Sequence, residues 1–192
     1  EVLKNVQLSV HNFRRLHVKG LDLEIDDPAF EGNKALLIRT TGGDPYALAE
    51  EVFIEGLRIE NNFIHSNTDA ISAYYLGVAE APLSRFVLQN SRITGIGIPG
   101  LGDGPGVHPD ILQFQGKVYI ESMYVEKFTG TTMYQGIYTP WNQNVEAAYQ
   151  QPEWKLREVN MSSEDPYTNR LFVSQDEGYP AADFPITSFE DV

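Results

Sequence analysis

Residues 52–59 read Val52-Phe-Ile-Glu-Gly56-Leu-Arg-Ile59. Apolar residues stand at the first, third, sixth and eighth positions, so an alternation of period two changes parity around Gly56. Alternation of this kind indicates β-strand, and a glycine at the change of parity indicates a tight bend. The segment therefore predicts two short strands joined by a corner.

The same pattern occurs five times in the 192 residues. The five copies begin at Leu16, Val52, Phe86, Val118 and Trp154. Their third positions are spaced by 36, 34, 32 and 36 residues, and bend residues are expected at Gly20, Gly56, Asn90 and Ser122. A third short strand-like run follows each copy, at 35–39, 69–73, 110–114, 136–139 and 170–174. Three strands per repeat predict a triangular solenoid whose coils stack about 4.8 Å apart and bury an apolar column.

The longer segment from Val52 to Ser72 resembles the repeat of right-handed parallel β-helix proteins, in which V-x-I-x-x-N/G-x-I-x-x-N precedes an apolar strand. The resemblance, to the bacterial glycan-active type of the pectin-lyase-like superfamily, covers roughly residues 2–175. It implies an all-β, right-handed parallel β-helix of about five coils with irregular loop insertions. We expect one such domain at 1–175, followed by an acidic tail at 176–192 that packs on the coil or is partly disordered.

Composition limits the classes of partner. With 14 Lys plus Arg against 27 Asp plus Glu, the net charge is -13, which repels a phosphate backbone and makes nucleic acid an unfavourable partner. No apolar run approaches the ~20 residues of a membrane span, and the first residues lack the order of a signal peptide. The absence of cysteine excludes disulfides and thiolate metal sites. A short solenoid with an open edge also predicts a homo-oligomer or a part of a larger chain.

The third strand of each repeat carries the chemically informative side chains. If Ile71, Leu112 and Ile137 are stacked equivalents, then Asp69, Asp110 and Gln135 form one column. The four insertions between repeats, at 41–51, 74–85, 95–107 and 140–152, are expected to form walls beside that column. These features predict a polysaccharide as the partner, and a secreted or cell-surface location.

Asn67-Thr68-Asp69 is similar to the Asn-Thr-Asp motif of polygalacturonases. The resemblance implies that Asp69 is a catalytic carboxylate, and that Asp110 stands in place of the family's next carboxylates. The adjacent Asp-Asp pair of that family is here Pro109-Asp110. A glycoside hydrolase is therefore one enzymatic interpretation, since two carboxyl groups suffice for either stereochemical outcome.

The favoured interpretation is a polysaccharide lyase that acts on a uronic-acid-containing glycan. The strand His108-x-Asp110-x-x-Gln113 resembles the His-x-Asp-x-x-Gln strand of many bacterial β-helix proteins that are presumed to act on extracellular glycans. β-Elimination needs a base, an acid and a group that neutralises the sugar carboxylate. His108 is the expected base, and Tyr134 or Tyr138 is the expected acid. The expected substrate-binding residues are Gln113, Gln135, Tyr138, Trp141, Lys117 and Lys127.

Two further expectations complete the sequence-based account. No His, Asp and Glu spacing predicts a transition-metal site, and calcium, held by Asp103, Asp110 and loop carbonyls, is the one cofactor left open. A non-catalytic β-helix, such as a glycan-binding adhesin or a tailspike segment, is the competing class, because the repeat and the charge require no active site.

Overall fold

The computed structural model describes the backbone of residues 1–27, 29–30, 34–40, 49–62, 69–78, 81–96, 109–115, 118–132, 135–138, 153–163, 170–173 and 187–190. The side chains are described for all of these except 115, 135, 138, 153, 154, 170–173 and 187–190. Every regular element in this part of the chain is a β-strand, and none of its segments is a helix that could cross a membrane.

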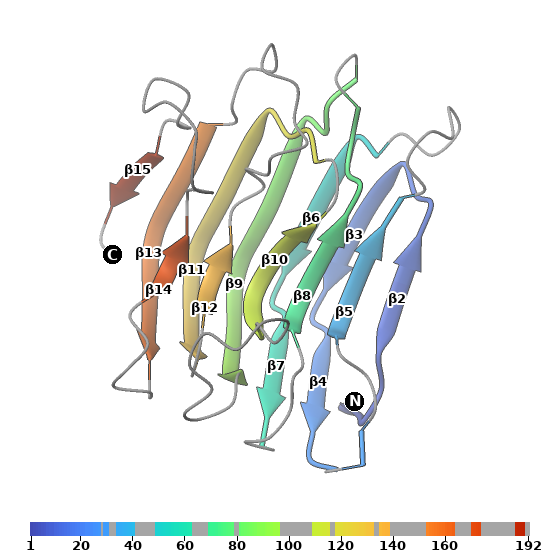
Figure 1. Cartoon of the computed structure of the whole chain (residues 1–192), viewed down its shortest axis with the longest axis vertical. Coiled ribbons are helices and arrows are strands. Elements are labelled where there is room, and N and C mark those ends of the chain that lie inside the picture. The colour runs from blue at the N-terminus through green and yellow to red at the C-terminus, as the bar shows by residue number, and fades with distance from the viewer. Residues whose placement is uncertain are drawn as a thin grey trace.

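The strands form two sheets in which all neighbouring strands are parallel (Figure 1). The six-stranded sheet contains β2 (Leu8–His11), β5 (Lys34–Arg39), β8 (Asp69–Tyr74), β10 (Asp110–Gln115), β12 (Gln135–Tyr138) and β14 (Arg170–Val173). The nine-stranded sheet contains β1 (Leu3–Lys4), β3 (Arg15–Lys19), β4 (Asp22–Ile25), β6 (Glu51–Glu55), β7 (Arg58–Asn61), β9 (Arg85–Ile96), β11 (Ser122–Thr132), β13 (Glu153–Ser163) and β15 (Thr187–Glu190).

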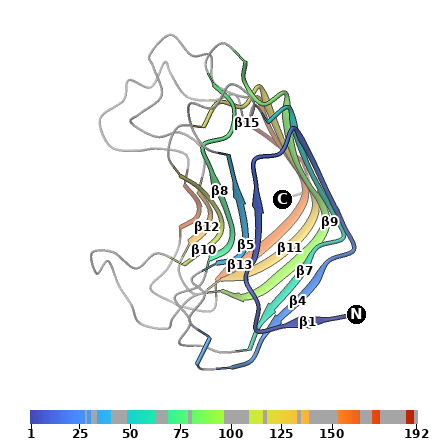
Figure 2. The ribbon, with the colours of Figure 1, turned by 90° about the vertical axis from the view of Figure 1, so that its right-hand side faces the viewer.

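The two sheets wind into a parallel β-helix, which confirms the predicted fold class. Viewed along its axis, the bent strands of the nine-stranded sheet lie opposite the shorter strands of the six-stranded sheet (Figure 2). The expected triangular coil is present in a modified form, because β9, β11 and β13 run through the corner without a break and so join two sides into one sheet. β15 lies in the segment predicted as a tail and pairs with β13.

The corner of each bent strand is a residue with positive φ. The φ values are 63° at Gly20, 65° at Gly56, 50° at Asn90, 49° at Lys127 and 51° at Glu158. Glycine and asparagine adopt this left-handed conformation at low cost, which is why the first three bends follow from the sequence. The fourth expected bend, at Ser122, is wrong.

The error arose from the register of the fourth repeat. Val125, and not Ile120, pairs with Leu88. The third positions are therefore Val18, Ile54, Leu88, Val125 and Leu156, spaced by 36, 34, 37 and 31 residues. Ile120 is also buried in the core, where it pairs with Leu83 in an isolated parallel bridge, so apolar character alone did not distinguish the two alignments.

The interior is a single continuous apolar core between the sheets. Phe86 of β9 and Phe114 of β10 meet across it edge to face, with ring centroids 5.1 Å apart and planes at 72°. Aromatic pairs favour this geometry, and both rings are almost completely buried. The contact ties the six-stranded sheet, which carries the candidate site residues, to the long bent strands.

Candidate functional site

The predicted column of polar residues is present at the beginning of three neighbouring strands. Leu112 of β10 pairs with Ile71 of β8 and with Ile137 of β12, as expected. Asp110 pairs with Gln135, and the same register places Asp69 on the other side of Asp110. The two carboxyl groups therefore come from adjacent coils of the solenoid.

The carboxylate of Asp69 is held by three groups. The backbone N–H of Asp110 donates to Oδ1 at 3.1 Å, and the Ser72 hydroxyl donates to Oδ2 at 2.7 Å. Lys34 of β5 brings its Nζ to 3.9 Å from Oδ2. Hydrogen bonds and a nearby cation favour the ionised form of a carboxyl group. Asp69 thus combines a negative charge with a fixed orientation, and it also caps the start of β10.

Asp110 has the opposite environment. Its side chain is 0% exposed, and within the described part of the chain neither carboxyl oxygen has a hydrogen-bond partner. Loss of solvation, followed by the charge of Asp69, raises the pKa of Asp110 from 3.8 to about 9. Asp110 is therefore protonated at neutral pH and can donate a proton, whereas its neighbour Asp69 can accept one.

Lys34 and Tyr74 extend this cluster along β5 and β8. Lys34 pairs in register with Asp69, and its Nζ lies 5.7 Å from the centre of the Tyr74 ring. Burial, and then the charge of Asp69, raises the pKa of the Tyr74 phenol. One cation thus lies between a carboxylate and an aromatic ring, in a site where water is largely excluded.

Three of the predicted substrate-binding residues lie on β10 and β12, but only Gln135 is in register with Asp110. Gln113 is on β10, one strand from Ser72 and from Tyr138, with which it pairs in register. Gln135 begins β12 next to Asp110. The Gln113 side chain is partly exposed, while the backbone alone is described for Gln135 and Tyr138. The structure therefore places the backbone of Gln135 beside Asp110, whereas Gln113 lies three residues further along β10 on the opposite face of the sheet, and Tyr138 pairs with Gln113.

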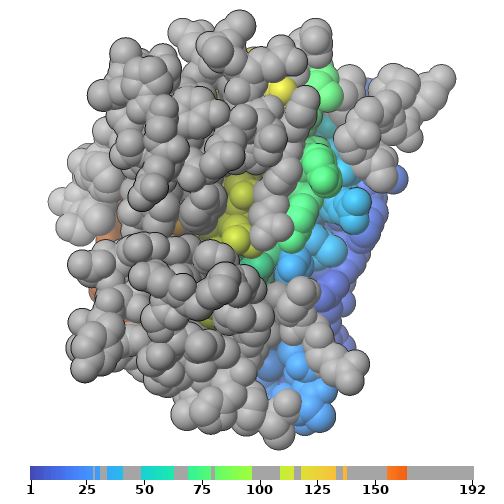
Figure 3. Space-filling model, viewed as in Figure 1, coloured from blue at the N-terminus to red at the C-terminus, as the bar shows by residue number. Residues whose placement is uncertain are grey.

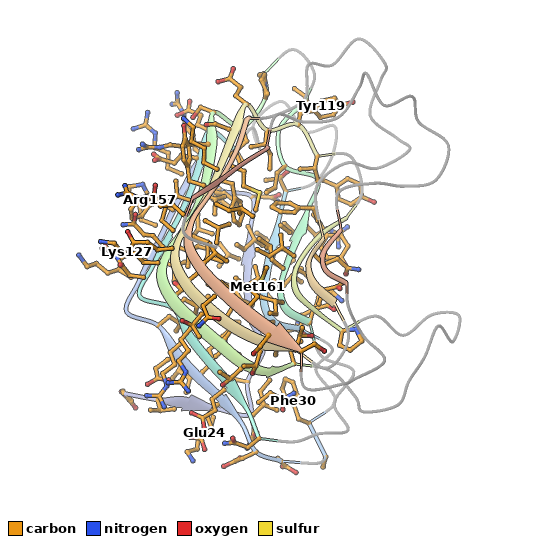
Figure 4. All side chains as sticks on the ribbon, turned by 90° about the vertical axis from the view of Figure 1, so that its left-hand side faces the viewer. Glu24, Phe30, Tyr119, Lys127, Arg157 and Met161 are labelled. Carbon is orange, nitrogen blue, oxygen red and sulfur yellow. The ribbon has the colours of Figure 1, made fainter. Side chains whose placement is uncertain are left out.

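The remaining predicted residues are not brought to this site. Lys127 lies at the bend of β11 in the other sheet, where its side chain points away from the six-stranded sheet (Figure 4). His108, Tyr134, Trp141 and Lys117 lie outside the described residues, so the roles given to them stay predictions.

Of the walls expected beside the column, those at 41–51, 95–107 and 140–152 lie largely or wholly outside the described residues, whereas the one at 74–85 is described except for residues 79 and 80. The segment 74–85 takes part in two isolated β-bridges, an antiparallel one from Val78 to Ala81 and a parallel one from Leu83 to Ile120, and in backbone hydrogen bonds such as that from Tyr119 N to Leu76 O. The carboxyl pair itself does not line an open groove, because Asp69 is only 6% exposed and Ser72 is buried.

No group of three or more His, Asp or Glu side chains suited to a metal ion occurs within the described ranges. Asp103, one of the calcium ligands considered above, is outside them. Asp110 is a poor calcium ligand in its protonated form, since calcium binds carboxylate oxygen. The arrangement fits proton transfer better than metal coordination.

Lys34 and Ser72 were not predicted as site residues. The sequence offered one sign of a role for Lys34, since this residue stands immediately before the strand-like run 35–39. In the structure Lys34 pairs in register with Asp69. Ser72 follows Asp69 by three residues in a strand that was read as apolar.

No family model, no curated protein and no solved structure matches the chain.

Proposed function

We propose that the chain is a secreted polysaccharide-degrading enzyme of the pectin-lyase-like superfamily, with Asp110 as its general acid and base and Asp69 as its nucleophile. The observation that carries this proposal is the pair of carboxyl groups on adjacent coils, one buried and protonated and the other hydrogen-bonded and charged. Two titratable groups whose environments push them to opposite protonation states are the usual arrangement for acid and base catalysis.

The pair supports glycoside hydrolysis. Asp110 would donate its proton to the glycosidic oxygen as the bond from that oxygen to the anomeric carbon breaks, while a carboxylate oxygen of Asp69 forms a bond to the same carbon from the opposite side. Water would then attack the anomeric carbon, give its proton to Asp110 and release Asp69 as a carboxylate. The backbones of adjacent parallel strands lie about 4.8 Å apart. This spacing is nearer to the ~5 to 5.5 Å that separates the two carboxyl groups of retaining enzymes than to the ~6.5 to 9.5 Å of inverting ones. Retention of anomeric configuration is therefore the expected outcome.

Two properties of Asp110 favour a role in proton donation. A buried carboxyl group without a partner among the described residues is costly, and such groups in native proteins commonly have a functional reason. Its proton is retained at neutral pH, where a general acid is needed. Because Asp110 has no exposed surface, the proposal also requires that substrate binding open a path to it.

The second candidate is a non-catalytic β-helix that binds glycans, as in an adhesin or a tailspike segment. The burial of Asp110 favours this alternative, and so does the structural role of Asp69 in capping β10. A polysaccharide lyase remains the third interpretation, and it depends on His108 and Tyr134, whose roles stay predictions.

The test is a panel of acidic and neutral polysaccharides incubated with the protein. We expect new reducing ends without the ultraviolet absorbance of unsaturated uronates. We also expect a loss of about 10²- to 10⁴-fold in Asp110→Asn and in Asp69→Asn. Asp22→Asn, which changes a carboxyl group on β4 in the other sheet, is the matched control. Ultraviolet-absorbing product would instead establish a lyase, and binding without product would establish the non-catalytic alternative.

A further inference from the structure

Lys34 is held between two neighbouring strands of the six-stranded sheet. It begins β5 and pairs in register with Asp69 of β8. The side chain of Lys34 is 13% exposed and that of Asp69 is 8% exposed. A lysine is seldom withdrawn from water to this extent unless it is paired. Figure 3 shows the two strands, β5 in light blue and β8 in green, side by side at the surface of the molecule. The pair therefore lies just below that surface.

Asp69 supplies the counter-ion of Lys34. Among the described residues, its carboxylate is the only acidic group within ion-pair distance of the Lys34 ammonium, with 3.9 Å between Nζ and Oδ2. The second attraction on this ammonium is the Tyr74 ring, whose centre lies 5.7 Å from Nζ. A carboxylate and a ring thus hold one cation, and only the carboxylate changes its charge during the reaction proposed above.

The charge of Asp69 disappears between the two steps of that reaction. When Asp69 bonds to the anomeric carbon it becomes a neutral ester, and the Lys34 ammonium keeps only its contact with the Tyr74 ring. In the second step the bond from the anomeric carbon to the Asp69 oxygen breaks and its electron pair returns to Asp69. The oxygen of water bonds to the same carbon, and a proton of that water goes to Asp110. A negative charge therefore develops beside a cation that has no counter-ion.

The cation affects the two steps in opposite directions. Before the first step it stabilises the Asp69 carboxylate, which makes Asp69 a weaker nucleophile. In the second step it stabilises the carboxylate that is leaving. A cation fixed where negative charge develops lowers the barrier most in a site from which water is largely excluded, as it is around Lys34. Loss of the cation should therefore slow release of the sugar without slowing its attachment.

We propose that Lys34 is a positioning residue that acts through Asp69 and speeds release of the sugar from it. This inference rests on the role of Asp69 as nucleophile that is proposed above. A lysine that only supported the fold would affect attachment and release of the sugar alike. The relative rates of these two steps are therefore the property that distinguishes an electrostatic role of Lys34 from a structural one.

The test separates the two steps with dinitrophenyl glycosides of glucose, galactose and galacturonic acid in both anomeric forms. Their leaving group departs without a general acid, so the first release of dinitrophenolate reports attachment of the sugar, and the steady rate reports its release. In Lys34→Met we expect a burst of one dinitrophenolate per protein chain, and then a steady rate on the order of 100-fold below that of the wild type. Mass spectrometry of the acid-quenched variant should show one added sugar residue, attached at Asp69.

Three further variants complete the comparison. Lys34→Arg keeps the cation and should release the sugar at nearly the wild-type rate. Lys34→Gln removes the charge but keeps a hydrogen-bond donor for Asp69, so it replaces Lys34→Met if that variant does not fold. The matched control is Lys155→Met, because Lys155 also lies over a tyrosine ring, 5.5 Å from the centre of Tyr124, but on β13 in the other sheet. This control should leave both steps unchanged.

Failure of this inference can be told apart from failure of the proposed function. A wild type that cleaves neither these glycosides nor any polysaccharide of the panel overturns the proposed function, and the role of Lys34 with it. A wild type that turns over a glycoside, while both uncharged variants show no burst and no sugar bound to Asp69, overturns the role of Lys34 alone. Circular dichroism of each variant shows whether the strands are retained.

Discussion

Replacement of Asp110 by asparagine should stabilise the protein at neutral pH. In the unfolded chain the Asp110 carboxyl ionises at its ordinary pKa of 3.8, whereas in the folded chain the pKa is about 9. The folded state therefore binds more protons between these values, and stability falls as pH rises through this window. At about 1.4 kcal/mol per pH unit, the loss by pH 7 relative to low pH is about 4 kcal/mol.

Asparagine has nearly the same shape and no charge, so Asp110→Asn should recover most of this loss. Urea unfolding at several pH values between 4 and 9 measures the effect. The free energy of unfolding of the variant should exceed that of the wild type by an amount that grows with pH. Asp22→Asn, which changes a carboxyl group on β4 in the other sheet, is the control variant. Equal stability of Asp110→Asn and wild type at every pH would contradict the raised pKa of Asp110.

Two further predictions concern the frame of the solenoid. Gly95→Ala should destabilise the protein far more than Gly20→Ala, as measured by thermal unfolding. Both glycines have positive φ, but an added Cβ at Gly95 would meet the backbone oxygen of Asn61 at 2.0 Å, and one at Gly20 would meet nothing within 4 Å. Phe86→Ala should lower the free energy of unfolding by about 3 to 5 kcal/mol in urea unfolding, because it leaves a cavity against Phe114; a loss below about 1 kcal/mol would contradict the packing described.

The fold was largely predictable because the repeat can be recognised from the spacing of its apolar residues and from the residues at its bends. Gly56 and Asn90 are residues that favour positive φ, so their corners could be recognised. Lys127 and Glu158 have no such preference and occupy the same conformation only because the neighbouring coils impose it. Local sequence therefore gave no sign of these two bends.

The fourth repeat shows how packing can hide a register. Gly130 occupies the place that Ile93 fills in the preceding coil, so an expected apolar position reads as a loop residue. An added Cβ at Gly130 would meet the Phe128 ring and Ile111 at 2.8 Å, which shows that their side chains fill the space. The core at this level is therefore filled by the side chains of Phe128 and Ile111, and not by a side chain at the position that pairs with Ile93.

The candidate site was predictable in its arrangement but not in its environment. The spacing of apolar residues was enough to align Asp69 with Asp110, because a strand period of two fixes which residues share a column. The burial of Asp110 depends on what surrounds it in three dimensions, and the approach of Lys34 depends on a neighbouring coil. Neither follows from the motif around Asp69.

The central claim is that Asp110 remains protonated at neutral pH beside a charged Asp69. Carbon NMR of the aspartate side-chain carboxyl groups, followed through a pH titration, tests it most directly. One carboxyl signal is expected to titrate with a pKa of about 9 and to be absent from Asp110→Asn. If every aspartate signal has finished titrating by about pH 6, two units above the ordinary aspartate range, the roles assigned to Asp110 and Asp69 are wrong.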